Sequence, residues 1–363
     1  MAYTTIDDPS EYFQIALYTG SGSDNTITND GNSNLKPDLL WVKCRSSTQD
    51  HMLFDSSRGF NGDGDSLYLE INADAETHND NDHLKSFNTD GFTMQGASSR
   101  SNKGDGSTYV AFQWKINEGT RTTNSESGNN PGGGYQVNTT SGVSIVDYTG
   151  TGGAGTMAHG LGAVPEAIFV HDRGGNDHPV YHKKAASDPE TDYFHFNDNG
   201  APTDDSGRWN DKAPTSTVFS LGTNNEVNGD GRTYLAWLFR SIQGFSKVGV
   251  YKGNNNGTNA PFINTGFKPA FVMFKRASIE DWGIVNIKSS PRATGTKTND
   301  MAYQLEANGT GAESNQIDFW FCSNGFRLDG SGAFANGDDE TYIYIAFAEQ
   351  PFVTSGGTPC TAL

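Results

Sequence analysis

Cysteine is scarce in this chain of 363 residues, which has only Cys44, Cys322 and Cys360. An odd number of cysteines at such wide spacing predicts neither a disulfide framework nor a zinc site. Basic residues are also few, 25 against 43 acidic ones, and the net charge is −18. Because nucleic acids and anionic membranes bind basic surfaces, we expect neither as a partner. No run of about 20 apolar residues occurs, so no membrane insertion is expected.

Glycine and aromatic residues are abundant instead. The chain has 44 glycines, 22 phenylalanines and 14 tyrosines, and Asn, Asp, Ser and Thr fill much of the remainder. No long segment has clean helical periodicity. This composition is typical of short strands joined by many turns, with large aromatic side chains supplying the buried area. The N-terminus begins with a polar stretch, MAYTTIDDPSEYF, which indicates synthesis in a cytoplasm without a signal peptide.

Four sequence landmarks recur three times in the same order and at nearly constant spacing. They are an opening Tyr-Thr-Gly or Tyr-Lys-Gly, a proline-led apolar strand, a short strand with a phenylalanine, and a closing strand with the pattern Tyr-aliphatic-Ala-aromatic. Such an ordered recurrence indicates internal repeats. The landmarks lie at Tyr18, Pro37, Phe92 and Tyr109, then at Tyr148, Pro165, Phe219 and Tyr234, and finally at Tyr251, Pro269, Phe326 and Tyr344.

We therefore predict an all-β chain of three tandem repeats, each resembling a β-sandwich or jelly roll. The stretch between the first two repeats is polar, rich in Gly and Asn, and is predicted to be a linker. The predicted divisions are an N-terminal arm (1–12), repeat 1 (13–117), the linker (118–140), repeat 2 (141–243), repeat 3 (244–353) and a C-terminal tail (354–363).

One acidic stretch, 61–66, resembles a loop that binds a hard cation. Asp63 and Asp65 place alternate carboxylates there, which makes them weak candidates for calcium ligands. An EF-hand would require a glutamate where the chain has Asn72, so that motif is absent. The alternative is a solvated turn, and no cofactor is expected.

Histidines gather in the second repeat, but their spacing matches no compact metal motif. No nucleophile elbow is present, and no carboxylate pair stands out, so we expect no catalytic activity. Trp209 lies in a polar context, GRWNDKAP, and is the candidate for stacking on a sugar ring. The histidines are His159, His171, His178, His182 and His195.

The order YTG, KPDLLWVKCR, HMLFDSSRG, SFNTDGFTM and YVAFQWK resembles a repeat domain of structural proteins of marine bacteriophages, which are tail-associated or fibre-like. The resemblance covers residues 13–363. The second repeat departs from it, with HPVYHKKA in place of the HMLFDSSRG element.

The resemblance implies a virion structural protein on the exterior of the particle, in a tail, a fibre or a capsid decoration, and made in the host cytoplasm. It also implies a homo-oligomer that binds other virion structural proteins and attaches to a host cell-surface glycan. The alternatives are a carbohydrate-binding module or adhesin and, after these, a glycan depolymerase.

Overall fold

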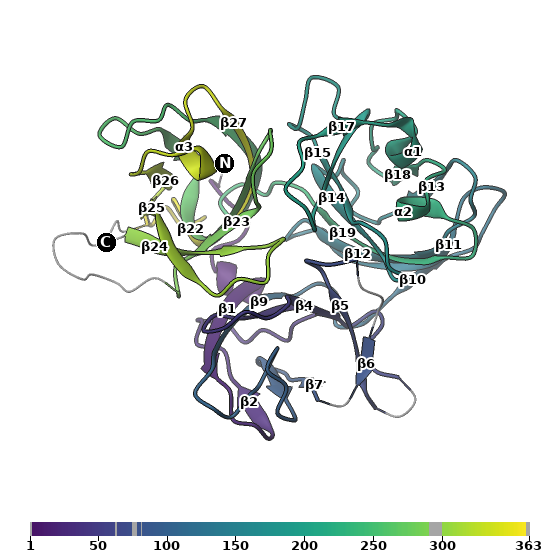
Figure 1. Cartoon of the computed structure of the whole chain (residues 1–363), viewed down its shortest axis with the longest axis horizontal. Coiled ribbons are helices and arrows are strands. Elements are labelled where there is room, and N and C mark those ends of the chain that lie inside the picture. The colour runs from purple at the N-terminus through teal and green to yellow at the C-terminus, as the bar shows by residue number, and fades with distance from the viewer. Residues whose placement is uncertain (1, 62–63, 75–77, 81, 290–299, 361–363) are drawn as a thin grey trace.

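The computed structural model describes residues 2–61, 64–74, 78–80, 82–289 and 300–360, and it is almost entirely β (Figure 1). This confirms the predicted all-β class. Within the described ranges, helical turns are short and few: η1 (Pro9–Glu11), α1 (Ser206–Trp209), α2 (Asn225–Asn228) and α3 (Ala333–Asn336). Three lobes surround a common centre, and we call residues 13–117, 118–243 and 244–353 the first, second and third lobe.

The first lobe packs a six-stranded sheet, in the order β1-β9-β3-β4-β5-β6, against a small sheet, β2-β8-β7. One face of the large sheet covers the small sheet, and the other face points to the centre of the molecule. Its strands are β1 (Phe13–Thr19), β2 (Asn25–Ile27), β3 (Leu39–Cys44), β4 (Met52–Asp55), β5 (Ser66–Glu70), β6 (His78–Asp80), β7 (Leu84–Phe87), β8 (Phe92–Met94) and β9 (Thr108–Trp114).

The second lobe contains an eight-stranded sheet, β10-β11-β12-β19-β14-β15-β16-β17, and the pair β13-β18. Its strands are β10 (Thr122–Asn124), β11 (Gly132–Asn138), β12 (Val143–Thr149), β13 (Gly155–Ala158), β14 (Ala167–Asp172), β15 (Pro179–His182), β16 (Asp192–His195), β17 (Thr203–Asp204), β18 (Val218–Leu221) and β19 (Thr233–Phe239).

The third lobe is one eight-stranded sheet, β20-β27-β22-β23-β24-β25-β26-β21. Its strands are β20 (Ser246–Lys252), β21 (Phe262–Asn264), β22 (Phe267–Arg276), β23 (Gly283–Asn286), β24 (Asp300–Glu306), β25 (Ser314–Cys322), β26 (Gly325–Leu328) and β27 (Thr341–Pro351).

All three large sheets contain the same succession of strands. The opening strand pairs with the closing strand, the closing strand pairs with the proline-led strand, and two further strands follow. In each lobe a tyrosine of the opening strand stacks on one of the closing strand, with ring centroids 4.8–5.1 Å apart. The paired residues are Tyr18 with Tyr109, Tyr148 with Tyr234, and Tyr251 with Tyr342.

In the third lobe the equivalent of Tyr109 and Tyr234 is therefore Tyr342, two residues before Tyr344, which the repeated landmarks had predicted. Tyr344 faces Gly249 instead. A Cβ on Gly249 would collide with the Tyr344 ring, so the glycine makes room for it. The first lobe has Ala16 opposite Ala111 at the same place. In the motif TYIYIAF the two tyrosines lie two residues apart, which is the period of a strand. The sequence pattern is therefore satisfied whether Tyr342 or Tyr344 lies opposite Tyr251.

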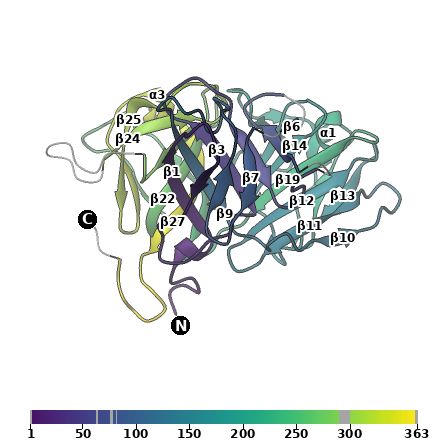
Figure 2. The same ribbon diagram turned by 90° about the horizontal axis from the view of Figure 1, so that it is seen from below.

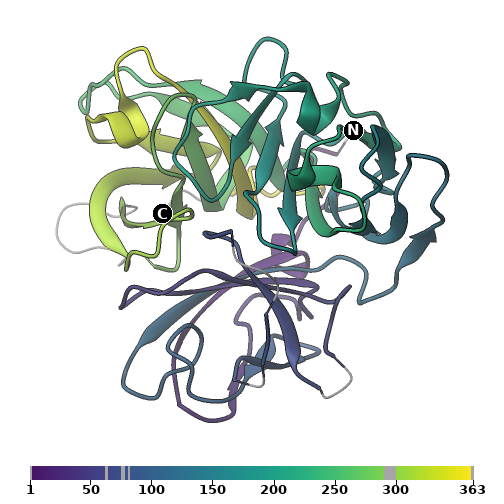
Figure 3. The ribbon, with the colours of Figure 1, turned by 45° about the vertical axis from the view of Figure 1, so that its right-hand side comes forward.

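The inner faces of the three sheets meet in one hydrophobic core. Figures 2 and 3 show the ribbons of the three lobes lying against one another. The ring of Phe271 in the third lobe lies 5.9 Å from that of Phe13 and 4.9 Å from that of Phe112 in the first. Trp41 in the first lobe meets Trp237 in the second edge-on at 6.0 Å. The lobes are thus parts of one packed body rather than independent domains.

Hydrogen bonds from ring nitrogens join each lobe to a neighbour. Each donor immediately precedes β4, β15 or β23, the strand that follows the proline-led strand in its lobe. Each acceptor is a carbonyl at the end of, or just after, β5, β16 or β24, the next strand in its own lobe. The three donor residues are buried, so each bond satisfies a ring N–H that has left water. The bonds run from His51 Nε2 to Glu306 O (3.0 Å), from His178 Nε2 to Ala73 O (2.8 Å) and from Trp282 Nε1 to His195 O (2.9 Å).

The structure corrects the prediction of a linker over 118–140. This segment contains β10 and β11, and β11 pairs with β12 along its whole length. The N-terminal segment is also packed, because Ile6 is buried and the Tyr3 hydroxyl donates to the carbonyl of Gly266. The C-terminal tail is held beside it through the backbone N–H of Ser355, which donates to Asp7.

Candidate functional site

Trp209 does not have the exposed position that the sequence predicted. It ends the single turn α1, its side chain is 2% exposed, and its Nε1 donates to the carbonyl of Asp192 at 3.1 Å. The ring meets Tyr181 edge-on in the core of the second lobe. Trp209 is therefore a packing residue, and it has no free face on which a sugar could stack.

The predicted calcium loop, 61–66, is described at Asn61 and from Gly64 onward. Asp63 lies outside the described residues. Asp65 accepts from the side-chain amide of Asn61 at 3.1 Å, and its own backbone N–H donates back to the Asn61 side chain at 2.8 Å. These bonds lie in the connection between β4 and β5, and binding of calcium there stays a prediction.

Four of the five histidines of the second lobe are buried. The ring of His171 packs between those of His178 and Trp237, at 4.5 and 5.1 Å. Burial lowers the pKa of His178 to about 4 and that of His182 to about 3, so both are neutral at physiological pH. These histidines serve as core residues and as donors between lobes.

His195 is different, because it lies between two carboxylates at the end of β16. Its Nε2 is 3.0 Å from Glu226 Oε2, and its Nδ1 is 3.2 Å from Asp198 Oδ2. Burial disfavours the imidazolium, but the hydrogen bonds to both carboxylates outweigh burial and raise the pKa of His195 to about 9. His195 therefore carries a positive charge at neutral pH.

Arg208 completes this network from α1. Its Nε and Nη2 donate to both oxygens of Glu226, at 3.0 and 2.7 Å. The guanidinium also pairs with Asp205 and lies 4.3 Å above the ring of Tyr193. A bidentate bond of this kind fixes the carboxylate in one orientation. The pKa of Glu226 is lowered by these partners, although burial alone would raise it.

Asp177 brings a third oxygen close, so that Asp177, His195 and Glu226 have potential ligand atoms within 4.8 Å of one another. A divalent cation there would have to displace the His195 proton and separate Arg208 from Glu226. At neutral pH the imidazolium and the guanidinium thus take the place of a cation. The arrangement is best suited to a structural ion network, which we call the His195 network.

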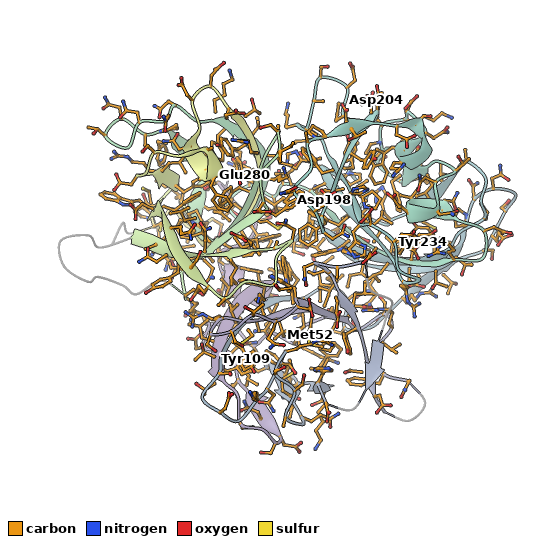
Figure 4. The ribbon with its side chains drawn as sticks, viewed as in Figure 1. Met52, Tyr109, Asp198, Asp204, Tyr234 and Glu280 are labelled. Carbon is orange, nitrogen blue, oxygen red and sulfur yellow. The ribbon has the colours of Figure 1, made fainter. Side chains whose placement is uncertain are left out.

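The His195 network sits where the second lobe meets the third. Figure 4 shows Asp198 on that side of the second lobe, with Glu280 of the third lobe nearby. The backbone N–H of Glu280 donates to Asn199 O at 3.0 Å, and the carbonyl of His195 accepts from Trp282. The sequence identified His195 among the five histidines. It gave no signal for Glu226 or Arg208, which reach the site from other turns.

Fold and site together define an all-β protein of three packed lobes, whose prominent polar cluster lies in the second lobe beside the third. The family model described as Domain of unknown function (DUF7483) matches residues 8–351, and the chain belongs to this family. No curated protein and no solved structure matches the chain. No helix in the described ranges is long and apolar enough to cross a membrane.

Proposed function

We propose that this chain is a structural component on the exterior of a bacteriophage particle, assembled as a homo-oligomer and without a catalytic role. The observation that carries the proposal is the shared core of the three lobes. A body in which aromatic rings from all three sheets interlock has no hinge between domains, and such stiffness suits a part that bears load or displays a surface.

The polar contacts between lobes support the same role. The three ring-nitrogen bonds run from one lobe to another, and the His195 network stabilises the edge of the second lobe at one of them, where the carbonyl of His195 accepts from Trp282. The net charge of −18 keeps such bodies apart in solution until a specific contact joins them. The resemblance of the repeated motifs to phage structural proteins is the reason for assigning the chain to a phage particle.

The proposal is tested on particles of the phage that encodes the chain. Particles are purified on a density gradient, washed in high salt, and the chain is quantified by mass spectrometry against the major capsid protein. We expect a fixed copy number per particle. Particles made from a genome without the gene should lack the chain and show an altered exterior or reduced adsorption.

The control is the same measurement on the soluble fraction of the lysate. Recovery of the chain only in that fraction would overturn the structural role. Progressive release of reducing ends from host capsule or lipopolysaccharide by the purified chain would favour a depolymerase instead, provided that a single Asp or Glu substitution abolished it.

A further inference from the structure

The opening strand of the third lobe, β20, has an open edge. It pairs with β27 on one side, and Gly253 N donates to Glu340 O in continuation of that ladder. In an antiparallel pair, alternate residues direct their N–H and C=O groups away from the partner. Here these are the even-numbered residues of β20.

The first two outward amides of β20 are satisfied within the chain. Ser246 N donates to the carbonyl of Ile242, and Val248 N donates to the hydroxyl of Ser241. The next two belong to Val250 and Lys252. No acceptor for either amide lies among the described residues. An unpaired stretch of this kind is a template for another strand.

The corresponding edge in the second lobe is filled. There β11 pairs with β12 over seven residues, from Gly132 opposite Thr149 to Asn138 opposite Val143. The side chain of Gln136 on β11 donates to Ser57 of the first lobe at 2.6 Å. A strand thus lies in the groove between an opening strand and the neighbouring lobe.

The corresponding edge in the first lobe is covered by a loop at its beginning. Gln14 on β1 donates from its amide to Ser33 O at 2.7 Å and accepts from Gly31 N at 3.0 Å. The loop is joined to the third lobe by an ion pair between Asp30 and Lys288. In the part of the chain that the structure describes, no strand pairs with the outer edge of β20, and no loop bonds to it at Val250 and Lys252.

The groove beside β20 is a cleft of about 550 Å³ between β20, β21 and the turn after β15. Val250 and Phe262, 42% and 48% exposed, are two of the few large apolar side chains exposed in the described chain, and both line it. Four lysines also line the cleft in a chain whose net charge is −18. They are Lys183, Lys184, Lys247 and Lys252.

Two of these lysines form ion pairs within the chain, and the other two have no carboxylate partner among the described residues. Lys183 pairs with Glu166, and Lys252 pairs with Asp339. Lys247 donates to Asn264 O across the cleft at 2.7 Å, and Lys184 is exposed. The positive charge therefore lies mainly with Lys184 and Lys247, on the two sides of the cleft.

We propose that the cleft beside β20 binds an extended acidic segment of a partner protein, which adds to the third sheet as a strand. Its backbone pairs with the outward groups of Val250 and Lys252, as β11 pairs with β12. Its apolar side chains rest on Val250 and Phe262, and its carboxylates meet Lys184 and Lys247. This inference goes beyond the proposed role on the particle and does not depend on it.

The test uses the full chain and a fluorescein-labelled twelve-residue peptide in which glutamate alternates with valine and threonine. Binding is measured by fluorescence anisotropy, and hydrogen exchange of the chain is measured with and without the peptide. We expect saturable binding and slower exchange of the Val250 and Lys252 amides. A peptide with lysine in place of glutamate should bind at least about tenfold more weakly.

Variants separate strand pairing from charge. Val250→Pro removes an outward N–H and should weaken peptide binding at least about tenfold. Leu17→Pro is the matched control, because Leu17 occupies the same position on β1 and should leave binding within about twofold. Lys184→Glu does not touch the backbone and should weaken binding by a similar factor at low salt.

Three results would overturn the inference. One is peptide binding that Val250→Pro leaves unchanged while circular dichroism shows a folded variant. Another is binding of an acidic polysaccharide, polygalacturonate, in the cleft with no binding of the peptide. The third is the absence of any binding at millimolar concentrations of either probe.

Discussion

Replacing Phe271 by alanine tests whether the three lobes share one cooperative core. Phe271 is 1% exposed and lies between rings of its own lobe and of the first, with Trp114 at 6.3 Å and Phe347 at 6.1 Å. Deletion of a buried phenylalanine side chain costs about 3–5 kcal/mol, and we expect about 4 because the surrounding rings are held by three sheets.

The expected shift in Tm follows from the size of the cooperative unit. If all 363 residues unfold together, the unfolding entropy is roughly 0.8 kcal/mol/K, so the variant should melt about 5 °C lower in a single transition. If a lobe of about 100 residues unfolds alone, the same loss shifts its own transition by roughly 20 °C and leaves the others unchanged.

Differential scanning calorimetry distinguishes the two outcomes, with Phe92→Ala as the matched variant. Phe92 is fully buried in the separate core of the first lobe, between its two sheets. Both variants should give one transition with a similar shift. Separate transitions in either variant would refute the reasoning that the lobes form one body. A single transition that shifts in only one of the two variants would refute it as well.

The remaining predictions concern single contacts. Trp282→Phe should cost about 0.5–1.5 kcal/mol in chemical denaturation, because it removes the hydrogen bond to the carbonyl of His195 between two lobes; an unchanged midpoint would show that water replaces the bond. Tyr342→Phe should cost a similar amount, because the hydroxyl donates to one carbonyl and accepts from one amide, whereas Tyr344→Phe should cost little; equal effects would contradict the register. The pKa of His195 is raised to about 9, so its stabilisation is complete below its unfolded pKa of about 6.5 and is lost as pH rises through 9. His195→Gln should flatten the fall in Tm over that range, and a fall of undiminished size would exclude the network as its cause. Ala111→Leu should cost about 1–3 kcal/mol by overpacking, and an unchanged Tm would show that space exists beside this fully buried residue.

The strands were predictable from the sequence where the residue pattern is local. The run LLWVKC in β3 is apolar on both faces except at Lys43, and all six residues are buried. The register of β27 was not predictable, because Tyr342 and Tyr344 lie two residues apart in a strand with the same periodicity. Only the partner strand, through Gly249, decides between them.

The segment 118–140 shows why composition misled. Its glycines predicted flexibility, yet Gly133 and Gly134 lie in β11, where a Cβ would collide with the neighbouring strands. Close approach of the backbones, rather than freedom of the chain, explains these residues. Trp209 misled in the same way, because its polar neighbours in sequence are not its neighbours in space. The His195 network joins the end of β16 to residues of the turns α1 and α2, and no spacing motif records this combination.

The central claim, that the chain is a fixed part of a phage exterior, is tested most directly by electron cryomicroscopy of the intact particle. The three-lobed body should fit a repeated density on the outside of the particle, at a symmetric position that is empty in particles from a genome without the gene. A complete reconstruction at side-chain resolution, with all exterior density accounted for by other chains, would contradict the claim.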